Sequence, residues 1–200
     1  MKYTYQTQKI IIAGIVLIVI FILIVAIFNS NPAVSPVSTP SPASTPSPTP
    51  TPNIFQGFQT DKYYITFYGW PDNSPSGNII AYPKSRYATK HETAGGIGTY
   101  NDPVTFASDP SRITIGKIYY LPFLAKYFVM EDYCESCRES WRKNLRHIDV
   151  WMESGPSFPK ELTECQQKWT RKEEVVIINP SPHFPVDPEP LFNKQIGQCN

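Results

Sequence analysis

The most apolar part of the chain is residues 10–28, which contain no charged side chain. As a helix, a segment of this length spans about 28 Å, close to the thickness of the hydrocarbon core of a bilayer. Because lipid cannot hydrogen-bond to the backbone, the pattern predicts a membrane-spanning helix. A cleavable signal peptide is the alternative. Its apolar core is usually only about 7–15 residues long, and residues 25–28 offer no small-residue cleavage pattern.

The flanking residues predict how this segment is oriented. Lys2 and Lys9 precede it, and no Lys or Arg follows it before residue 52. Positive residues beside a membrane helix favour the cytoplasmic side. We therefore expect a cytoplasmic N-terminus (residues 1–9), an anchor (residues 10–28), and the rest of the chain outside the cytoplasm as a single-pass membrane protein.

Residues 29–52 consist mostly of Pro, Ser and Thr. Such a segment has little to bury, and its prolines favour an extended polyproline-like spacer, so we interpret it as a passive linker. Residues 53–200 are long enough for one compact domain with a core.

Short runs of β-branched and aromatic residues recur along this domain, separated by turn signals such as Pro71-Asp72-Asn73 and Gly95-Gly96. They predict a mainly β domain, a small barrel or sandwich. One short amphipathic helix is expected over residues 159–168, with Pro159 in its first turn and Leu162 and Cys165 on one face. The predicted strands are residues 63–68, 104–107, 117–121, 126–130, 147–151 and 174–178.

The charge pattern argues against one class of partner. All 17 acidic residues and all but two of the 18 basic residues lie beyond residue 52, so the domain is nearly neutral. It contains no basic run interleaved with aromatic residues, and we therefore expect no nucleic-acid partner. We also expect no cofactor.

The four cysteines, Cys134, Cys137, Cys165 and Cys199, all lie in this domain. Outside the cytoplasm they predict two disulfides, in one of three pairings, which would brace the loops. The Cys-x-x-Cys spacing at Cys134 and Cys137 also fits a redox motif or half of a zinc site. A redox motif usually opens a helix after a strand, whereas Glu135 and Ser136 are predicted to lie in a loop, and we expect no bound metal.

The order of several motifs resembles the three-aspartate domain of bacterial cell-wall lytic enzymes and of membrane-bound lytic transglycosylase A. Asp109, Asp132 and Asp149 fall at the three aspartate positions. Two further segments are similar to those of rare lipoprotein A and the expansins. The supporting motifs are Thr66-Phe67-Tyr68-Gly69, Ala107-Ser108-Asp109-Pro110, Val129-Met130-Glu131-Asp132 and His147-Ile148-Asp149. The resemblance covers about residues 63–179 and implies a six-stranded double-psi β-barrel.

The resemblance also implies a function, namely binding of a β-linked polysaccharide in a groove with an acidic residue at the scissile bond. By position Asp149 is the candidate general acid, and Asp132 is a second carboxylate or an orienting group. Sugar rings stack on flat side chains, so the candidate substrate-binding residues are Trp70, Trp141, Tyr68 and His147. The structural alternatives are a turn at Asp109-Pro110, a cap or Arg146 pair for Asp132, and core positions for the aromatic residues.

One departure from the family pattern bears on activity. Residues 133–141, with two cysteines, replace the glycine-rich turn that follows the middle aspartate. Three hypotheses remain open: an enzyme that cleaves a cell-wall glycan, with peptidoglycan preferred and a lytic transglycosylase or glycosidase mechanism; an expansin-like module that binds glycan without cutting it; and a structural protein of the cell envelope.

Overall fold

The computed structural model describes residues 55–200. The expected cytoplasmic N-terminus, the anchor at residues 10–28 and the linker at residues 29–52 lie outside the described residues. Within the part of the chain that is described, no helix is both long and apolar enough to cross a membrane.

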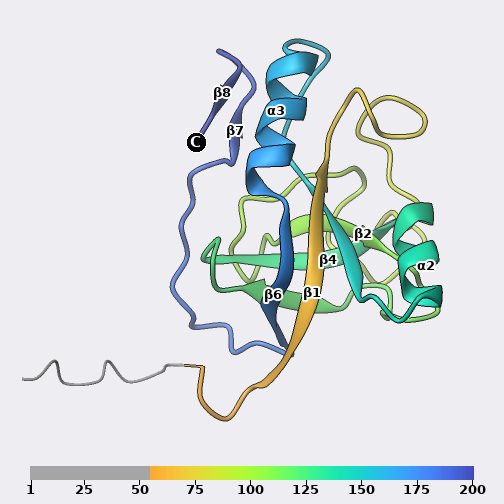
Figure 1. Cartoon of the computed structure of the whole chain (residues 1–200), viewed down its shortest axis with the longest axis vertical. Helices are drawn as coiled ribbons and strands as arrows, with labels where there is room; N and C mark the ends of the chain where they lie inside the picture. Colours follow the sequence, from red (N-terminus) through yellow and green to blue (C-terminus); the bar gives the residue numbers. More distant parts are fainter. Residues whose placement is uncertain (1–54) are drawn as a thin grey trace, which may run out of the picture. The chain divides into compact units, whose positions relative to one another are not determined.

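Six strands close into a barrel in the order β1-β5-β2-β4-β3-β6 (Figure 1). The prediction of a mainly β domain built as a small barrel is therefore confirmed. Each predicted run became a strand, and several strands extend beyond the predicted run. The barrel strands are β1 (Gln59–Tyr68), β2 (Val104–Ser108), β3 (Ile118–Leu121), β4 (Lys126–Tyr133), β5 (His147–Trp151) and β6 (Arg171–Ile178).

Two of the neighbouring pairs in the barrel are parallel, β1 with β5 and β2 with β4. The other four pairs are antiparallel, and the β1–β6 and β3–β6 pairs close the barrel. Parallel partners need long connections. Residues 109–125 join β2 to β4, and the whole stretch of residues 69–146 separates β1 from β5. Within that stretch, residues 69–103 and 134–146 carry much of the candidate site.

The expected helix is present as α3 (Pro159–Trp169), with Pro159 in its first turn and with Leu162 and Cys165 buried. A second helix, α2 (Glu135–Arg142), was not predicted, so the placement of Glu135 and Ser136 in a loop was wrong. The sequence of α2 is mostly polar and shows little apolar periodicity. Its first turn is stabilised by Cys134, whose sulfur accepts a hydrogen bond from the Cys137 N–H at 3.0 Å.

The expectation of two disulfides is confirmed, with the pairings Cys134–Cys137 and Cys165–Cys199. The second bond ties the C-terminal segment to α3, beside the short hairpin of β7 (Phe192–Asn193) and β8 (Gln198–Cys199). In Figure 1 this hairpin lies next to α3, whereas α2 lies against the other side of the barrel.

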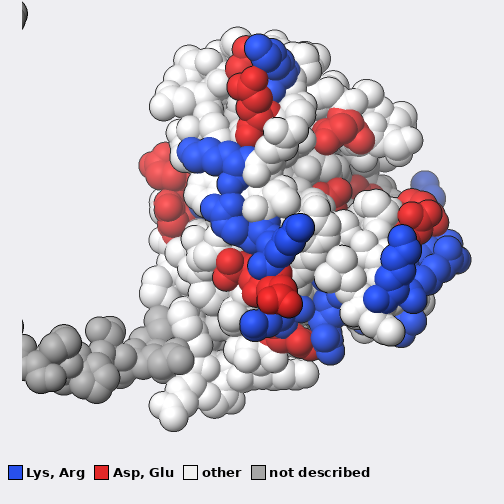
Figure 2. Space-filling model, viewed as in Figure 1, with Lys and Arg blue, Asp and Glu red and all other residues white. Residues whose placement is uncertain are grey.

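The core fills the barrel and continues beneath α3. Ile65, Phe106, Phe128, Ile148 and Val150 are fully buried between the strands. Basic side chains gather over α2 on the face shown in Figure 2, with acidic side chains next to them, and elsewhere on that face the two signs are mixed.

Candidate functional site

Four residues on four adjacent strands form one row across the barrel wall. Ala107 of β2 pairs with Asp132 of β4 on one side and with Asp149 of β5 on the other. Asp149 in turn pairs with Thr66 of β1. Residues paired across a sheet project to the same face, so the two aspartates lie about two strand spacings, or ~10 Å, apart at the backbone. Only the methyl group of Ala107 stands between them in this row.

Asp132 reaches the row because β4 contains a bulge. The β2–β4 register shifts so that Phe106 pairs with Met130 but Ala107 pairs with Asp132. Glu131 is the additional residue, and its carboxylate instead contacts His91 Nδ1 at 2.7 Å. Without the bulge, Glu131 would lie opposite Ala107. The bulge thus decides which of two adjacent acids joins Asp149.

Asp132 and Asp149 both line one pocket of about 470 Å³. This volume is in the range of small-molecule binding sites. The wall is formed by the row of strands, by the turn after β1, by residues 79–81 and by the start of α2. The residues lining the pocket are Tyr68, Asp72, Asn73, Ser74, Ile79, Ile80, Ala81, Ala107, Asp132, Tyr133, Cys134, Glu135, Ser136 and Asp149.

Asp149 keeps its proton more firmly than an ordinary aspartate. Its pKa is raised to about 7, mainly because burial removes water from the carboxyl group. The negative charges of Asp72 and Asp132 add to the rise, and the hydroxyl of Thr66, which can donate to an ionised Asp149, opposes it. The side chain is nonetheless partly exposed where it meets the pocket, so a protonated carboxyl group faces the space that a ligand would occupy.

A chain of hydrogen bonds behind Asp149 connects it to His147 and to α2. Thr66 Oγ1 lies 2.7 Å from Asp149 Oδ1 and 2.8 Å from His147 Nε2. On the far side of the ring, His147 Nδ1 lies 3.0 Å from Ser140 Oγ, which itself donates to the Ser136 carbonyl oxygen. Thr66 and Ser140 thus contact the two ring nitrogens of His147 from opposite sides.

The Thr66 hydroxyl donates to Asp149 Oδ1 and also contacts His147 Nε2, so it links the two side chains. An imidazolium beside a carboxylate would place two charges in a poorly hydrated site. Burial lowers the pKa of His147 to about 4 and raises that of Asp149 to about 7. Burial thus favours the uncharged form of both side chains.

Asp132 is held in a different way. Its Oδ1 accepts from the N–H groups of Ala81 and Tyr133 at 2.9 and 2.8 Å, and its Oδ2 accepts from the Tyr68 hydroxyl at 2.9 Å. Burial raises the pKa of Asp132, and these three donors oppose the rise. Asp132 therefore fixes residue 81 and Tyr68 in the pocket wall. The Arg146 partner considered from the sequence pairs instead with Asp61.

The predicted substrate-binding residues have different surroundings. Tyr68 lines the pocket, whereas Trp70, Trp141 and His147 are not among its lining residues. Trp141 is partly buried against the Tyr63 ring, and its indole N–H donates to the His147 carbonyl oxygen at 3.2 Å. Trp70 is partly buried, and its backbone N–H donates to Ser154. His147 is buried.

Asp109 lies apart from the pocket. Its carboxylate accepts from the Ser111 N–H at 3.0 Å, and its carbonyl oxygen accepts from the N–H groups of Arg112 and Ile113. It therefore stabilises the turn after β2, as its position before a proline suggests.

Several residues at the site were not named as candidates from the sequence, among them Thr66 behind Asp149 and the pocket residues Asp72 and Tyr133. Thr66 had a usable signal, since it stands two positions before Tyr68 on a predicted strand and therefore shares its face. Asp72 appeared only as part of a turn. It accepts from the Gly69 N–H at 2.7 Å, and a Cβ at Gly69 would lie 2.4 Å from Ser154 Oγ, so a larger residue would displace the Ser154 side chain.

Among the described residues, no group of three or more His, Cys, Asp or Glu side chains is arranged to hold a metal ion. The two cysteines of the Cys-x-x-Cys motif are joined in a disulfide.

Comparison with known proteins places this domain in a family. The family model described as "DDB_G0273701 N-terminal domain" matches residues 60–200. The chain belongs to this family. A relative from Dictyostelium discoideum, "Uncharacterized protein DDB_G0273701/DDB_G0273221", is 38% identical over 137 residues, which make up 68% of this chain and 58% of the relative. The chain thus spans less than two thirds of that relative's length. No solved structure matches the chain.

Proposed function

We propose that this domain binds a β-linked cell-wall polysaccharide, peptidoglycan by preference, in the pocket that contains Asp149, and that Asp149 cleaves it as a general acid. The observation that carries the proposal is a carboxyl group with a pKa of about 7 that opens onto a pocket of about 470 Å³. A general acid must hold its proton near the working pH and release it in the transition state.

The engagement of Asp132 favours a lytic transglycosylase over an inverting hydrolase. Inversion needs a second carboxylate free to activate water, but Asp132 already accepts three hydrogen bonds. In the transglycosylase reaction Asp149 donates its proton to the glycosidic oxygen as the C1–O bond breaks. A hydroxyl of the same sugar then bonds to C1, and its proton returns to Asp149. This step needs one acid.

The barrel supports the finer assignment of the fold as a double-psi β-barrel. Its six strands close with two parallel pairs, and each of these pairs carries one of the two aspartates. The sequence resemblance to the three-aspartate, rare lipoprotein A and expansin proteins points to the same architecture.

The disulfides support a location outside the cytoplasm. Cys134–Cys137 and Cys165–Cys199 are both formed, and structural disulfides persist in oxidising compartments. With the apolar segment at residues 10–28, the proposal is a domain tethered to the outer face of a membrane by a proline-rich linker.

A binding module without catalysis is the second candidate, and α2 is the observation that favours it. Glu135 and Ser136 of α2 line the pocket at the place where the resembling enzymes have a glycine-rich turn. A groove altered at this point retains the walls that hold a sugar but loses the geometry around the acid.

The test compares the full oxidised chain in mild detergent with two variants, Asp149→Asn and Asp109→Asn. Asp109→Asn is the matched control because it changes an aspartate outside the pocket. Peptidoglycan, chitin and cellulose are incubated separately with each protein. Wild type and Asp109→Asn should release anhydro-sugar ends from the cleaved glycan, and Asp149→Asn should release at least about a hundredfold less while still sedimenting with it.

Each outcome separates the candidates. Sedimentation without products from any protein would identify a binding module. Undiminished products from Asp149→Asn would refute the assigned acid. Neither binding nor products with any of the three glycans would refute a role in polysaccharide recognition.

A further inference from the structure

The Cys134–Cys137 disulfide opens α2 directly after β4. A Cys-x-x-Cys pair between a strand and the first turn of a helix is typical of redox-active disulfides. The sequence separation of 3 also means that the bond constrains the unfolded chain less than a bond over a long loop does. Stabilisation therefore explains this disulfide less well than it explains Cys165–Cys199, whose sequence separation is 34.

The Cys134 sulfur has donors that would stabilise a thiolate. It accepts from the Cys137 N–H at 3.0 Å, and it lies 3.3 Å from the Ser136 hydroxyl, which can donate to it. The N-terminal end of α2 adds the positive end of the helix dipole. Glu135 opposes these effects, but its carboxylate lies 3.8 Å from the Arg138 guanidinium, which balances its charge. A thiolate released at Cys134 is therefore favoured over one in an ordinary loop.

The two sulfurs of this disulfide differ in access. Cys134 is 6% exposed and lines the pocket of Asp149, next to the exposed Ser136 that its sulfur contacts. Cys137 is fully buried, and its sulfur lies 3.9 Å from the Ala107 carbonyl oxygen. A thiolate that enters the pocket therefore meets the sulfur of Cys134 and not that of Cys137.

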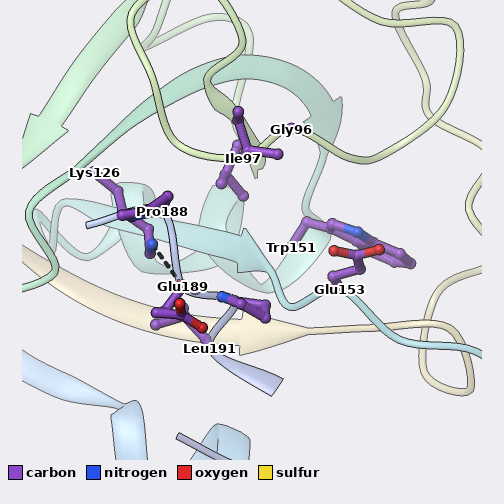
Figure 3. Close-up of a pocket in the computed structure, with 10 residues that line it drawn as sticks. Gly96, Ile97, Lys126, Trp151, Glu153, Pro188, Glu189 and Leu191 are labelled. Carbon is purple, nitrogen blue, oxygen red and sulfur yellow. Dashed lines mark hydrogen bonds between the residues drawn. The ribbon is translucent and has the colours of Figure 1, made fainter. Parts of the chain in front are cut away.

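The second disulfide, Cys165–Cys199, has different surroundings. It also borders a pocket, so access alone does not separate the two bonds. Cys165 lies beyond the first turn of α3 and Cys199 lies in β8, so neither sulfur is at a helix N-terminus. The bond fixes the C-terminal segment, which Lys126 also holds through the carbonyl oxygens of Asp187 and Glu189, beside the cavity shown in Figure 3. Its role is to brace this segment.

The charge of the pocket restricts which thiols can enter. Asp72, Asp132, Asp149 and Glu135 line it, and no Lys or Arg is among its described lining residues. Carboxylates repel an anionic thiol and attract a cationic one, most strongly at low salt.

We propose that the Cys134–Cys137 disulfide oxidises dithiols, or pairs of small thiols, that enter the pocket of Asp149, and that it prefers thiols carrying a positive charge. A substrate thiolate attacks the Cys134 sulfur, the S–S bond breaks, and Cys137 leaves with the electron pair and takes up a proton. A second substrate thiolate attacks the substrate sulfur of this mixed disulfide, and Cys134 leaves as a thiolate. The substrate becomes a disulfide, and the protein gains two electrons and two protons. This activity does not depend on glycan cleavage.

The test uses the full oxidised chain in mild detergent, without oxygen, and two probes of similar size, cysteamine and 3-mercaptopropionate, with opposite charges. Free thiols are trapped over time with N-ethylmaleimide, and peptide mass spectrometry measures the labelling of each cysteine. Each rate is divided by the rate of the same thiol with bis(2-hydroxyethyl) disulfide, which removes differences in intrinsic reactivity.

Thiols should appear at Cys134 and Cys137 at least about tenfold faster than at Cys165 and Cys199. At this site the corrected rate with cysteamine should exceed that with 3-mercaptopropionate by at least about threefold at low salt. Equal rates at the two disulfides, or thiols that appear only when urea unfolds the chain, would overturn the exchange site. An equal or faster corrected rate with 3-mercaptopropionate would overturn entry through the acidic pocket.

Two matched variants locate the attacked sulfur. Cys137→Ser, incubated with cystamine, should form a mixed disulfide at Cys134. Cys134→Ser should form at least about tenfold less at the buried Cys137. Equal labelling of the two variants would refute attack at Cys134, and because both variants keep Cys165–Cys199, its intact mass in each digest checks that the fold is retained.

Discussion

Replacing Asp149 by asparagine should change how stability depends on pH. The pKa of Asp149 in the folded chain is raised from its ordinary 3.8 to about 7. At pH values between these two pKa values, the folded state binds more protons than the unfolded state. Asp149 therefore makes the free energy of unfolding fall as pH rises. Its destabilising effect is absent below about pH 4 and complete above about pH 7. The asparagine side chain of the variant cannot ionise and escapes this effect.

The size of the effect follows from the two pKa values. One pKa unit corresponds to about 1.4 kcal/mol, so the rise to about 7 gives an upper limit of about 4 kcal/mol. Partial exposure of Asp149 to the pocket and its interaction with Asp132 reduce this, and we expect about 2 kcal/mol. Asp149→Asn should therefore be more stable than wild type by about 2 kcal/mol at pH 8.5, and by only about 0.5 kcal/mol at pH 4.5.

Urea unfolding of the oxidised chain, followed by tryptophan fluorescence at these two pH values, measures the difference. Glu161→Gln on the exposed face of α3 is the control, and its free energy of unfolding should follow wild type at both pH values. Equal differences between Asp149→Asn and wild type at pH 4.5 and 8.5 would refute the assignment of a buried, protonated Asp149.

Two further predictions concern the scaffold. Removing the Cys165–Cys199 disulfide, whose cysteines are 34 residues apart, should lower the free energy of unfolding by about 4 kcal/mol. Removing Cys134–Cys137, with a separation of 3, should lower it by about 2 kcal/mol. Equal losses in urea unfolding of the two double-alanine variants would contradict this prediction. The pKa of His91 is raised by its hydrogen bond to Glu131, so its stabilising effect is present below about pH 6.5 and is lost as pH rises through the folded-state pKa. His91→Gln should therefore lower the free energy of unfolding, measured in urea, by more at pH 5.5 than at pH 9. An equal loss at both pH values would refute this prediction.

The barrel strands were visible in the sequence because they are short runs of β-branched and aromatic residues between turn signals. The strand at residues 147–151, for example, was predicted with the bounds that β5 has. The helix at Pro159 was visible for a similar local reason, with a first-turn proline and two buried residues three positions apart.

The second helix was not visible, because its stability comes from contacts outside its own sequence. Residues 135–142 are mostly polar, and Cys137 is their one buried residue. The helix forms where the sulfur of Cys134 accepts from its first turn and where Ser140 contacts His147 of β5. Neither contact has a periodic signature.

The candidate acids could be named from the sequence, but what surrounds them could not. The order of motifs shared with the three-aspartate proteins pointed to Asp132 and Asp149. Which face Asp132 occupies depended on the bulge at Glu131, because a shift of one residue moves a side chain to the other face of a strand. The raised pKa of Asp149 likewise arises from burial by segments distant in the chain, and burial is a property that only the folded arrangement decides.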